Sequence, residues 1–109
     1  MNNLVILSDT LQSEVSGSEY VAQSMLWAAR EYLSLTLESE EQIKFDDGGS
    51  SRLEVFHAKY NEVTEERLFM QTARACGKKI YLMTLGLEND TAADKYPQYI
   101  SFLSSFTCQ

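Results

Sequence analysis

Short apolar runs separated by polar turns make up most of the chain, and this pattern predicts β-strands. Residues 4–8 form the first run, which leads into Asp9-Thr10 and is typical of a buried strand that enters a loop. Later runs predict strands at 42–45, 52–61, 67–75 and 79–87. Because short turns containing Gly or Asp separate these runs, we expect hairpins and a mainly antiparallel sheet.

Apolar residues recur at helical spacing after the first strand. Ser16 and Glu19 form an S-x-x-E capping box, in which each side chain satisfies a backbone donor of the first turn, so a helix should begin there. A broad apolar stripe predicts that this helix runs to about Leu35. The members of the stripe are Val21, Ala22, Met25, Leu26, Ala29, Tyr32 and Leu33.

A final helix is predicted near the end of the chain, because Pro97 is tolerated only in a first helical turn. Its buried stripe is expected to be Tyr99, Ile100, Leu103 and Phe106. The predicted order is therefore β-α-β-β-β-β-α, a single α+β domain over 1–109 with an antiparallel sheet of about five strands packed by two helices. Both faces of the strand at 79–87 are apolar, so a further helix or a bound partner must cover the second face.

Composition and charge exclude several classes of partner. The 109 residues are 44% hydrophobic and carry a net charge of −7, so phosphate backbones and anionic membranes should repel the chain. The longest apolar run, 25–29, is too short to cross a bilayer, so we expect no nucleic acid and no membrane insertion. The excess acid gathers before residue 48, either as a solvated strand edge or as a steering patch for a basic partner.

The start of the chain and its cysteines predict a compartment. The start carries no basic segment followed by a long apolar one, so we expect a cytoplasmic protein. Cys76 and Cys108 are spaced for no metal site, and we expect both to be reduced. The alternative for Cys76 is a reactive thiolate, because Lys78 and Lys79 follow it.

The remaining reactive groups do not combine into a recognisable catalytic site. His57 lies in the middle of a predicted strand without partners nearby in the sequence, so we interpret it as structural. The segment 48–51 has no phosphate-binding lysine and follows two aspartates, so it is a hairpin turn. We therefore expect a non-enzyme, with no catalytic residues, no cofactor and no metal.

Two surfaces are candidates for binding a partner protein. Helical rotation of about 100° per residue places Tyr20, Gln23, Trp27 and Glu31 opposite the apolar stripe, either as an interface or under cover of the chain itself. The second surface is the sheet face that this helix does not use. Its candidates are Met70, Met83, Phe56, Tyr60 and Tyr81, for which the alternative is ordinary core filling.

Five short motifs carry a resemblance to a known family. They are 3–9 (NLVILSD), 19–23 (EYVAQ), 69–71 (FMQ), 77–84 (GKKIYLMT) and 102–106 (FLSSF). Together they resemble the DcrB/PsbP-like group of α+β domains, which includes the Ran-binding Mog-type proteins and the Eag chaperones of type VI secretion. Domains of that group usually have an additional strand segment before the first motif, whereas this chain begins with it. The difference predicts an uncovered edge or face and a homodimer formed through it.

These observations favour a non-enzymatic protein-binding module, adaptor or chaperone-like, that grips a partner peptide or helix by its sheet face. Resemblance to the Eag chaperones implies contacts between Gln71, with neighbouring sheet residues, and apolar helices of a secreted effector. The alternative is a small-ligand-binding protein or an enzyme with a pocket between sheet and helices, where His57 or Cys76 would react. A third reading is an orphan that kept the fold while its function diverged.

Overall fold

A computed structural model describes residues 2–108 of the chain. Its helices and strands follow the predicted order. They are β1 (Asn3–Thr10), α1 (Gly17–Glu31), β2 (Ser34–Lys44), β3 (Ser50–Lys59), β4 (Arg67–Cys76), β5 (Lys79–Glu88), the 3₁₀ turn η1 (Ala93–Lys95) and α2 (Tyr96–Ser104). The α+β class and the antiparallel sheet with two helices are therefore confirmed.

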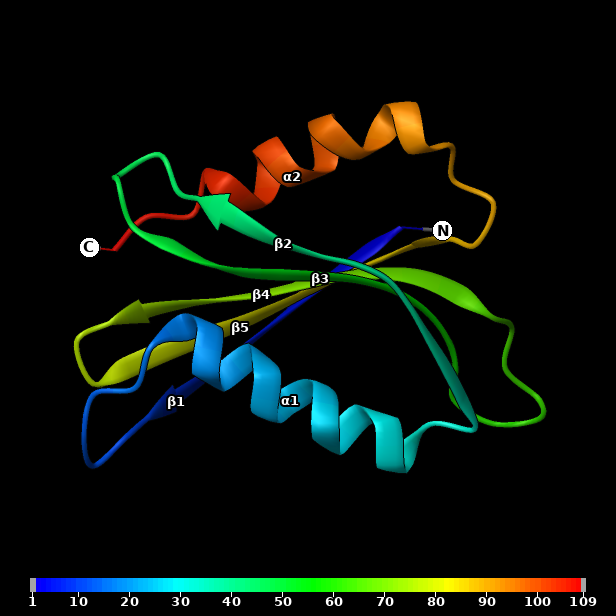
Figure 1. Cartoon of the computed structure of the whole chain (residues 1–109), viewed down its shortest axis with the longest axis horizontal. Coiled ribbons are helices and arrows are strands. Elements are labelled where there is room, and N and C mark those ends of the chain that lie inside the picture. The colour runs from blue at the N-terminus through cyan, green and yellow to red at the C-terminus, as the bar shows by residue number, and fades with distance from the viewer. Residues whose placement is uncertain (1, 109) are drawn as a thin grey trace.

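The strands of residues 2–108 form one five-stranded antiparallel sheet in the order β1-β5-β4-β3-β2. Strands β2 to β5 pair with their neighbours in sequence, as the turns predict, and β1 joins the far edge beside β5. Helix α1 lies on one face of the sheet and α2 on the other (Figure 1). The second apolar face of β5 is thus covered by a helix.

Helix α1 begins where the capping box places it and ends earlier than predicted. The Ser16 Oγ accepts a hydrogen bond of 3.1 Å from the backbone N–H of Glu19. At Tyr32 the backbone turns to the extended conformation, and the Leu33 N–H then bonds to the carbonyl of Tyr60 at 3.1 Å. Pairing with β3 therefore begins at Ser34, so the predictions of a helix to Leu35 and of a strand restricted to 42–45 are wrong.

The hydrophobic core is divided between the two faces of the sheet. Within residues 2–108 the larger cluster lies on the face that α2 covers and contains Ile43, Phe45, Leu53, Val55, Leu68, Met70, Met83, Leu85, Leu87 and Leu103. The smaller cluster, under α1, contains Val21, Ala73 and Ile80. The buried stripe of α1 is narrower than predicted, because Leu26, Ala29 and Leu33 are exposed.

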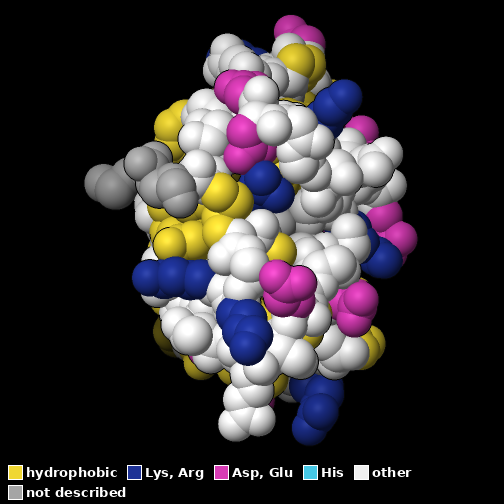
Figure 2. Space-filling view, turned by 90° about the vertical axis from the view of Figure 1, so that its left-hand side faces the viewer, with side chains coloured by type: hydrophobic (Ala, Val, Ile, Leu, Met, Phe, Trp, Pro, Cys, Tyr) yellow, Lys and Arg dark blue, Asp and Glu magenta, His cyan; other side chains and the backbone are white. Residues whose placement is uncertain are grey.

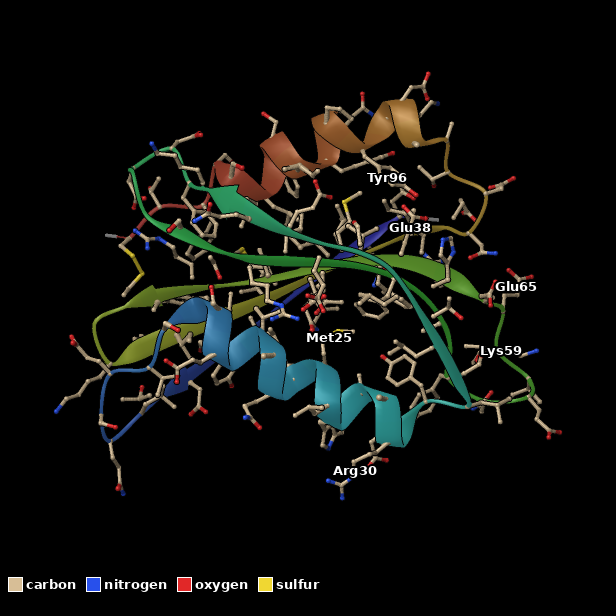
Figure 3. The ribbon with its side chains drawn as sticks, in the orientation of Figure 1. Met25, Arg30, Glu38, Lys59, Glu65 and Tyr96 are labelled. Carbon is tan, nitrogen blue, oxygen red and sulfur yellow. A yellow bond between two sulfur atoms is a disulfide. The ribbon has the colours of Figure 1, made fainter. Side chains whose placement is uncertain are left out.

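The two cysteines form a disulfide, so the prediction that both are reduced is wrong. Their Cα atoms are 5.7 Å apart, which suits the bond and ties the chain after α2 to the end of β4 (Figure 3). The carboxylate of Asp47 accepts hydrogen bonds from Arg74 at 2.8 Å and from the backbone N–H of Cys108 at 3.1 Å. These bonds and that from the Gly49 N–H lower the pKa of Asp47 to about 2. The reactive-thiolate alternative for Cys76 is also excluded in this oxidised state.

Cross-strand cations partly neutralise the acidic part of the chain. Arg52 pairs with Glu40 at 2.5 Å, and Arg74 pairs with Asp47. Basic and acidic side chains are interspersed at the end of the molecule that holds the turns after β2 and β4 (Figure 2). This arrangement favours the solvated strand edge over the steering patch.

Candidate functional site

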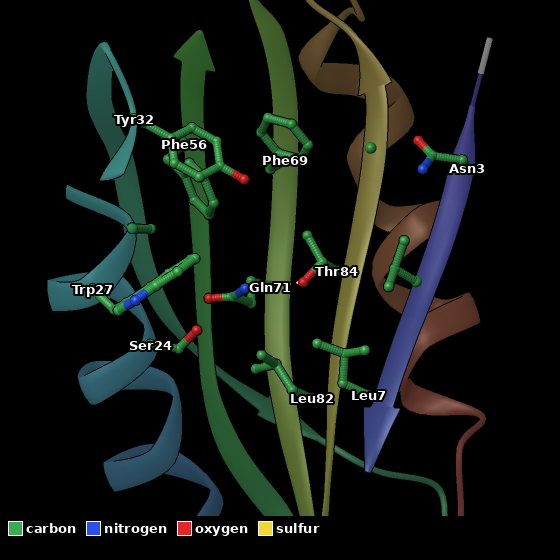
Figure 4. A pocket seen from close by; sticks show the side chains of 13 residues that line it. Asn3, Leu7, Ser24, Trp27, Tyr32, Phe56, Phe69, Gln71, Leu82 and Thr84 are labelled. Carbon is green, nitrogen blue, oxygen red and sulfur yellow. Dashed lines mark hydrogen bonds between the residues drawn. The ribbon is translucent and has the colours of Figure 1, made fainter. Parts of the chain in front are cut away.

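A groove opens between α1 and β1 on the face of the sheet that α1 covers (Figure 4). Helix α1 packs mainly on β3 and β4, so it leaves β5 and β1 less covered. The groove has a volume of about 250 Å³. A second hollow of about 270 Å³ continues beside α1 and shares Ser24, Trp27 and Leu82 with the first. The two hollows therefore adjoin each other along α1.

The walls of the groove are apolar and partly exposed. Trp27 of α1 is 58% exposed and Leu7 of β1 is 60% exposed. Both line the groove, as do Ala28 of the helix, Tyr32 just after it and Val5 of the strand. Large apolar side chains that border a hollow at the surface are typical of interaction sites.

The floor combines an aromatic cluster with a polar centre. Phe56 and Phe69 stack across β3 and β4 with their ring centroids 5.4 Å apart, and Tyr32 meets Phe69 edge-on at 6.4 Å. This cluster supports the end of the groove near the C-terminus of α1. At Gly86 an added Cβ would lie 2.5 Å from the Asn3 Oδ1, so glycine leaves room for the Asn3 side chain over β5.

Within residues 2–108, two buried acceptors on the α1 side of the sheet have no hydrogen-bond partner, and one of them, the Gln71 Oε1, lies in the floor of the groove. Gln71 is 6% exposed, and its Nε2 donates to the Thr84 Oγ1 at 2.9 Å while its Oε1 has no partner. Glu54 lies directly opposite Gln71 in the register of β3 and β4. One of its oxygens accepts from Arg52, and Oε2 has no partner. Cross-strand partners point to the same face, so both acceptors belong to the α1 side of the sheet.

Burial governs the charge of Glu54. Removal from water raises the pKa of its carboxyl above the ordinary value, and the hydrogen bond from Arg52 opposes that rise.

A buried oxygen without a hydrogen-bond partner destabilises the protein, and a donor placed beside it removes that cost. The Gln71 Oε1 points from the floor toward the α1 wall (Figure 4). A ligand in the groove that carries an N–H or O–H donor would therefore satisfy this oxygen.

A hydrogen bond links α1 to β1 beside the second hollow. The hydroxyl of Tyr20 donates to the Asp9 Oδ2 at 3.5 Å. Burial, followed by the charge of Asp9, raises the pKa of Tyr20. Gln23 lines the same hollow and is exposed. Tyr20, Gln23 and Trp27 thus lie together along one side of α1, beside the sheet.

The other two predicted partner-binding residues lie elsewhere. Glu31 is exposed at the last turn of α1 and does not line the groove. Met83 is 1% exposed in the cluster under α2. It therefore fills the core, which was the alternative interpretation for that face. Gln71 does lie at the groove. The sequence did not predict Leu7 and Val5 as groove residues, because this wall forms only when β1 pairs with β5. Their alternation with Ile6 along the strand was the available signal.

The residues considered for catalysis lie outside the groove. His57 Nδ1 is 2.6 Å from the Asn89 Oδ1, and its Nε2 is 2.9 Å from the Glu38 Oε1. The hydrogen bond with Asn89 and the contact with Glu38 raise the pKa of His57. Tyr96 of α2 donates to the same Glu38 oxygen at 3.2 Å, so this network joins α2 to the sheet (Figure 3). His57 therefore has structural partners, and Cys76 is held in the disulfide.

Among residues 2–108, no group of three or more His, Cys, Asp or Glu side chains is arranged to hold a metal ion. No helix in this part of the chain is long and apolar enough to cross a membrane. No family model, curated protein or solved structure matches the chain.

Proposed function

We propose that the protein is a non-enzymatic binding module, adaptor or chaperone-like, that holds an apolar segment of a partner protein in the groove between α1 and β1. The observation that carries this proposal is the pair of exposed apolar walls, Trp27 and Leu7, above the unpartnered Gln71 Oε1. Aromatic residues are enriched at the centres of interfaces, where they bury large areas at low entropic cost.

The chemistry of the groove selects a particular kind of segment. Its volume of about 250 Å³ suits one or two large side chains, and its walls favour apolar ones. The acceptor on Gln71 favours a group that brings a donor, such as an indole N–H, a phenol O–H or a free backbone N–H. The partner is thus an apolar segment with one such donor.

A peptide-display selection from a library without tryptophan, against the immobilised protein, supplies defined probes. Fluorescence of Trp27, the single tryptophan of the chain, then reports occupation of the groove. Leu7→Asp alters the β1 wall. Leu33→Asp is the matched control, because Leu33 is 56% exposed but does not line the groove. We expect selected peptides to shift the emission to shorter wavelength, to bind Leu33→Asp normally and to bind Leu7→Asp about tenfold more weakly. Equal affinities for the two folded variants would overturn the groove as the site.

Gln71→Leu separates recognition from stability. The substitution removes both the buried Oε1, which has no partner within residues 2–108, and the hydrogen bond that Nε2 donates to Thr84 Oγ1. These two effects oppose each other, so we expect the free energy of unfolding to change by about 1 kcal/mol or less. Peptides that carry the donor should bind the variant about tenfold more weakly. Urea denaturation and titration of Trp27 emission measure the two effects. Undiminished affinity would remove Gln71 from the proposed site.

A small apolar ligand in the same groove is the second candidate, favoured by the aromatic floor under Tyr32. Native mass spectrometry of protein purified from its source distinguishes the two candidates. A small molecule that is retained by the wild type and lost from Leu7→Asp would support this second function and count against a peptide-binding role.

We also propose that the chain is a DcrB/PsbP-like domain and that it forms a homodimer. The positions of the motifs support the first proposal, because 3–9 corresponds to β1, 19–23 lies in α1 and 69–71 lies in β4. The apolar outer edge of β1 supports the second.

The Cys76–Cys108 bond favours an oxidising compartment over the cytoplasm that the sequence suggested. Alkylation of thiols in unlysed cells, followed by mass spectrometry, tests the compartment: a modified Cys108 would contradict it.

A further inference from the structure

The outer edge of β1 carries exposed apolar side chains on both sides of the sheet. Val5 and Leu7 project toward the groove under α1, and Ile6 projects to the other side, where it borders a hollow with Phe102 of α2. Ile6 is 45% exposed. Because β1 is the last strand of the sheet, its outer backbone groups have no strand to pair with in residues 2–108.

The opposite edge of the sheet has the protections that β1 lacks. β2 carries Glu38, Glu40 and Glu41, and its pairing with β3 is interrupted by an irregularity between Leu37 and Ser39. Charge and bulges are the devices by which edge strands avoid further pairing. Residues 3–8 of β1 contain no charged side chain and pair with β5 without interruption.

We infer that β1 pairs in antiparallel fashion with β1 of a second copy, in the register that places Ile6 opposite Ile6 of the partner subunit. The inference rests on the proposed homodimer and adds its surface and register. Opposed residues share a face, so this register sets Val5 against Leu7 of the partner subunit on the groove side. Asp9, the one charged residue of β1, then meets Asn3 of the partner subunit, and no like charges face each other.

Neighbouring registers match less well. A shift of two residues in one direction sets Leu7 against Asn3 of the partner subunit, so apolar side chains face polar ones. A shift in the other direction sets Val5 against Asp9 of the partner subunit, which brings a carboxylate against an apolar side chain. The register centred on Ile6 alone matches apolar with apolar at all three exposed positions.

The pairing joins the two sheets into one, with a two-fold axis that passes beside Ile6. Because the axis is perpendicular to the sheet, both α1 helices lie on the same face. The two grooves then open side by side toward the axis, and Leu7 of each subunit lies between them. A partner with two apolar segments would thus engage both subunits at once.

Cysteine substitution tests the register in the full chain. Ile6→Cys places two thiols across the axis, within the distance that a disulfide spans, and should give a covalent dimer on a non-reducing gel after mild oxidation. Ser8→Cys lies on the same face as Ile6 but is set against Leu4 of the partner subunit. It should stay uncrosslinked alone and should crosslink when mixed with Leu4→Cys.

Light scattering separates the possible failures. A monomeric wild type at micromolar concentration would overturn both the homodimer and the register. A dimer that crosslinks through Ser8→Cys alone, or not at all through Ile6→Cys, would overturn the β1 pairing and leave the homodimer intact. Ile6→Lys should yield a monomer that still binds displayed peptides at the groove, so loss of dimerisation and loss of groove binding are measured independently.

Discussion

The two faces of the sheet differ in how completely they are covered. On one face, α2 and the segment after it cover a continuous apolar cluster, and the disulfide holds that segment in place. On the other, the longer helix α1 packs over β3 and β4 and leaves a groove beside β1. The length of a helix therefore does not decide how much it covers; its position across the strands does.

The same strands contribute to both faces of the sheet, so the difference in burial between the faces arises from alternate residues along each strand. Along β4, Leu68 and Met70 are buried under α2, whereas Phe69 and Gln71 line the groove. Along β5, Thr84 is at the groove and Leu85 is in the core. A period of two residues is thus enough to place a packed core and a recognition surface on one sheet.

The largest expected effect comes from a matched pair of aromatic truncations. Phe45 is 2% exposed in the α2-side cluster, so Phe45→Ala should lower the free energy of unfolding by about 3–5 kcal/mol. Trp27→Ala should lower it by about 1 kcal/mol or less, because Trp27 is half exposed at the groove. Urea denaturation followed by circular dichroism measures both. Similar losses in the two variants would contradict the difference in burial between the α2-side cluster and the groove.

Removing the disulfide should destabilise the α2 side of the sheet by the next largest amount. Cys76 and Cys108 are 32 residues apart, so the Cys76→Ser, Cys108→Ser double variant should lose about 3–4 kcal/mol of stability. Phe106, which packs against the α2-side cluster, lies in the segment that would be released. Peptide binding at the groove should persist under conditions where the variant is folded. If the folded double variant bound peptides more weakly, in proportion to its loss of stability, the groove would depend energetically on the α2 side of the sheet.

The smallest effect should come from pH, through His57. Contacts with Asn89 and Glu38 raise its pKa above the ordinary value of 6.5 in the folded state. The folded protein therefore binds this proton more tightly, so the stabilisation is complete below pH 6.5 and is lost as the pH rises through the raised pKa. Urea denaturation from pH 5.5 to 8.5 measures the slope. His57→Gln should remove it, and a slope that persists in the variant would assign the effect to another group.

The order of the elements was predictable because each depends on local patterns. The Ser16 capping box, the hairpin turns and the Pro97 start all act within a few residues, and the structure places elements at each. The alternation of Ile80, Leu82 and Thr84 with Met83 and Leu85 likewise follows from the period of a strand. Local chemistry of this kind does not depend on the rest of the chain.

The groove and the disulfide depend on contacts that the pattern does not encode. The β1 wall exists because β1 pairs with β5 at the far edge, and Cys108 meets Cys76 only after α2 crosses the sheet. The end of α1 was missed for a related reason: residues 32–35 suit a helix locally, but pairing with β3 draws them into an extended strand. Tertiary contacts overrode local preference in each case.

The pairing of β1 with β5 also has a consequence in time. Asn3 pairs with Gly86, so a ribosome that adds about 5–20 residues per second makes the partner of Asn3 about 4–17 s after Asn3 itself. Throughout that interval the apolar run 4–7 lacks its partner strand. Pairing across such a separation in sequence is slow to form, so β1 is synthesised before the other strands but cannot be protected by pairing until β5 is made.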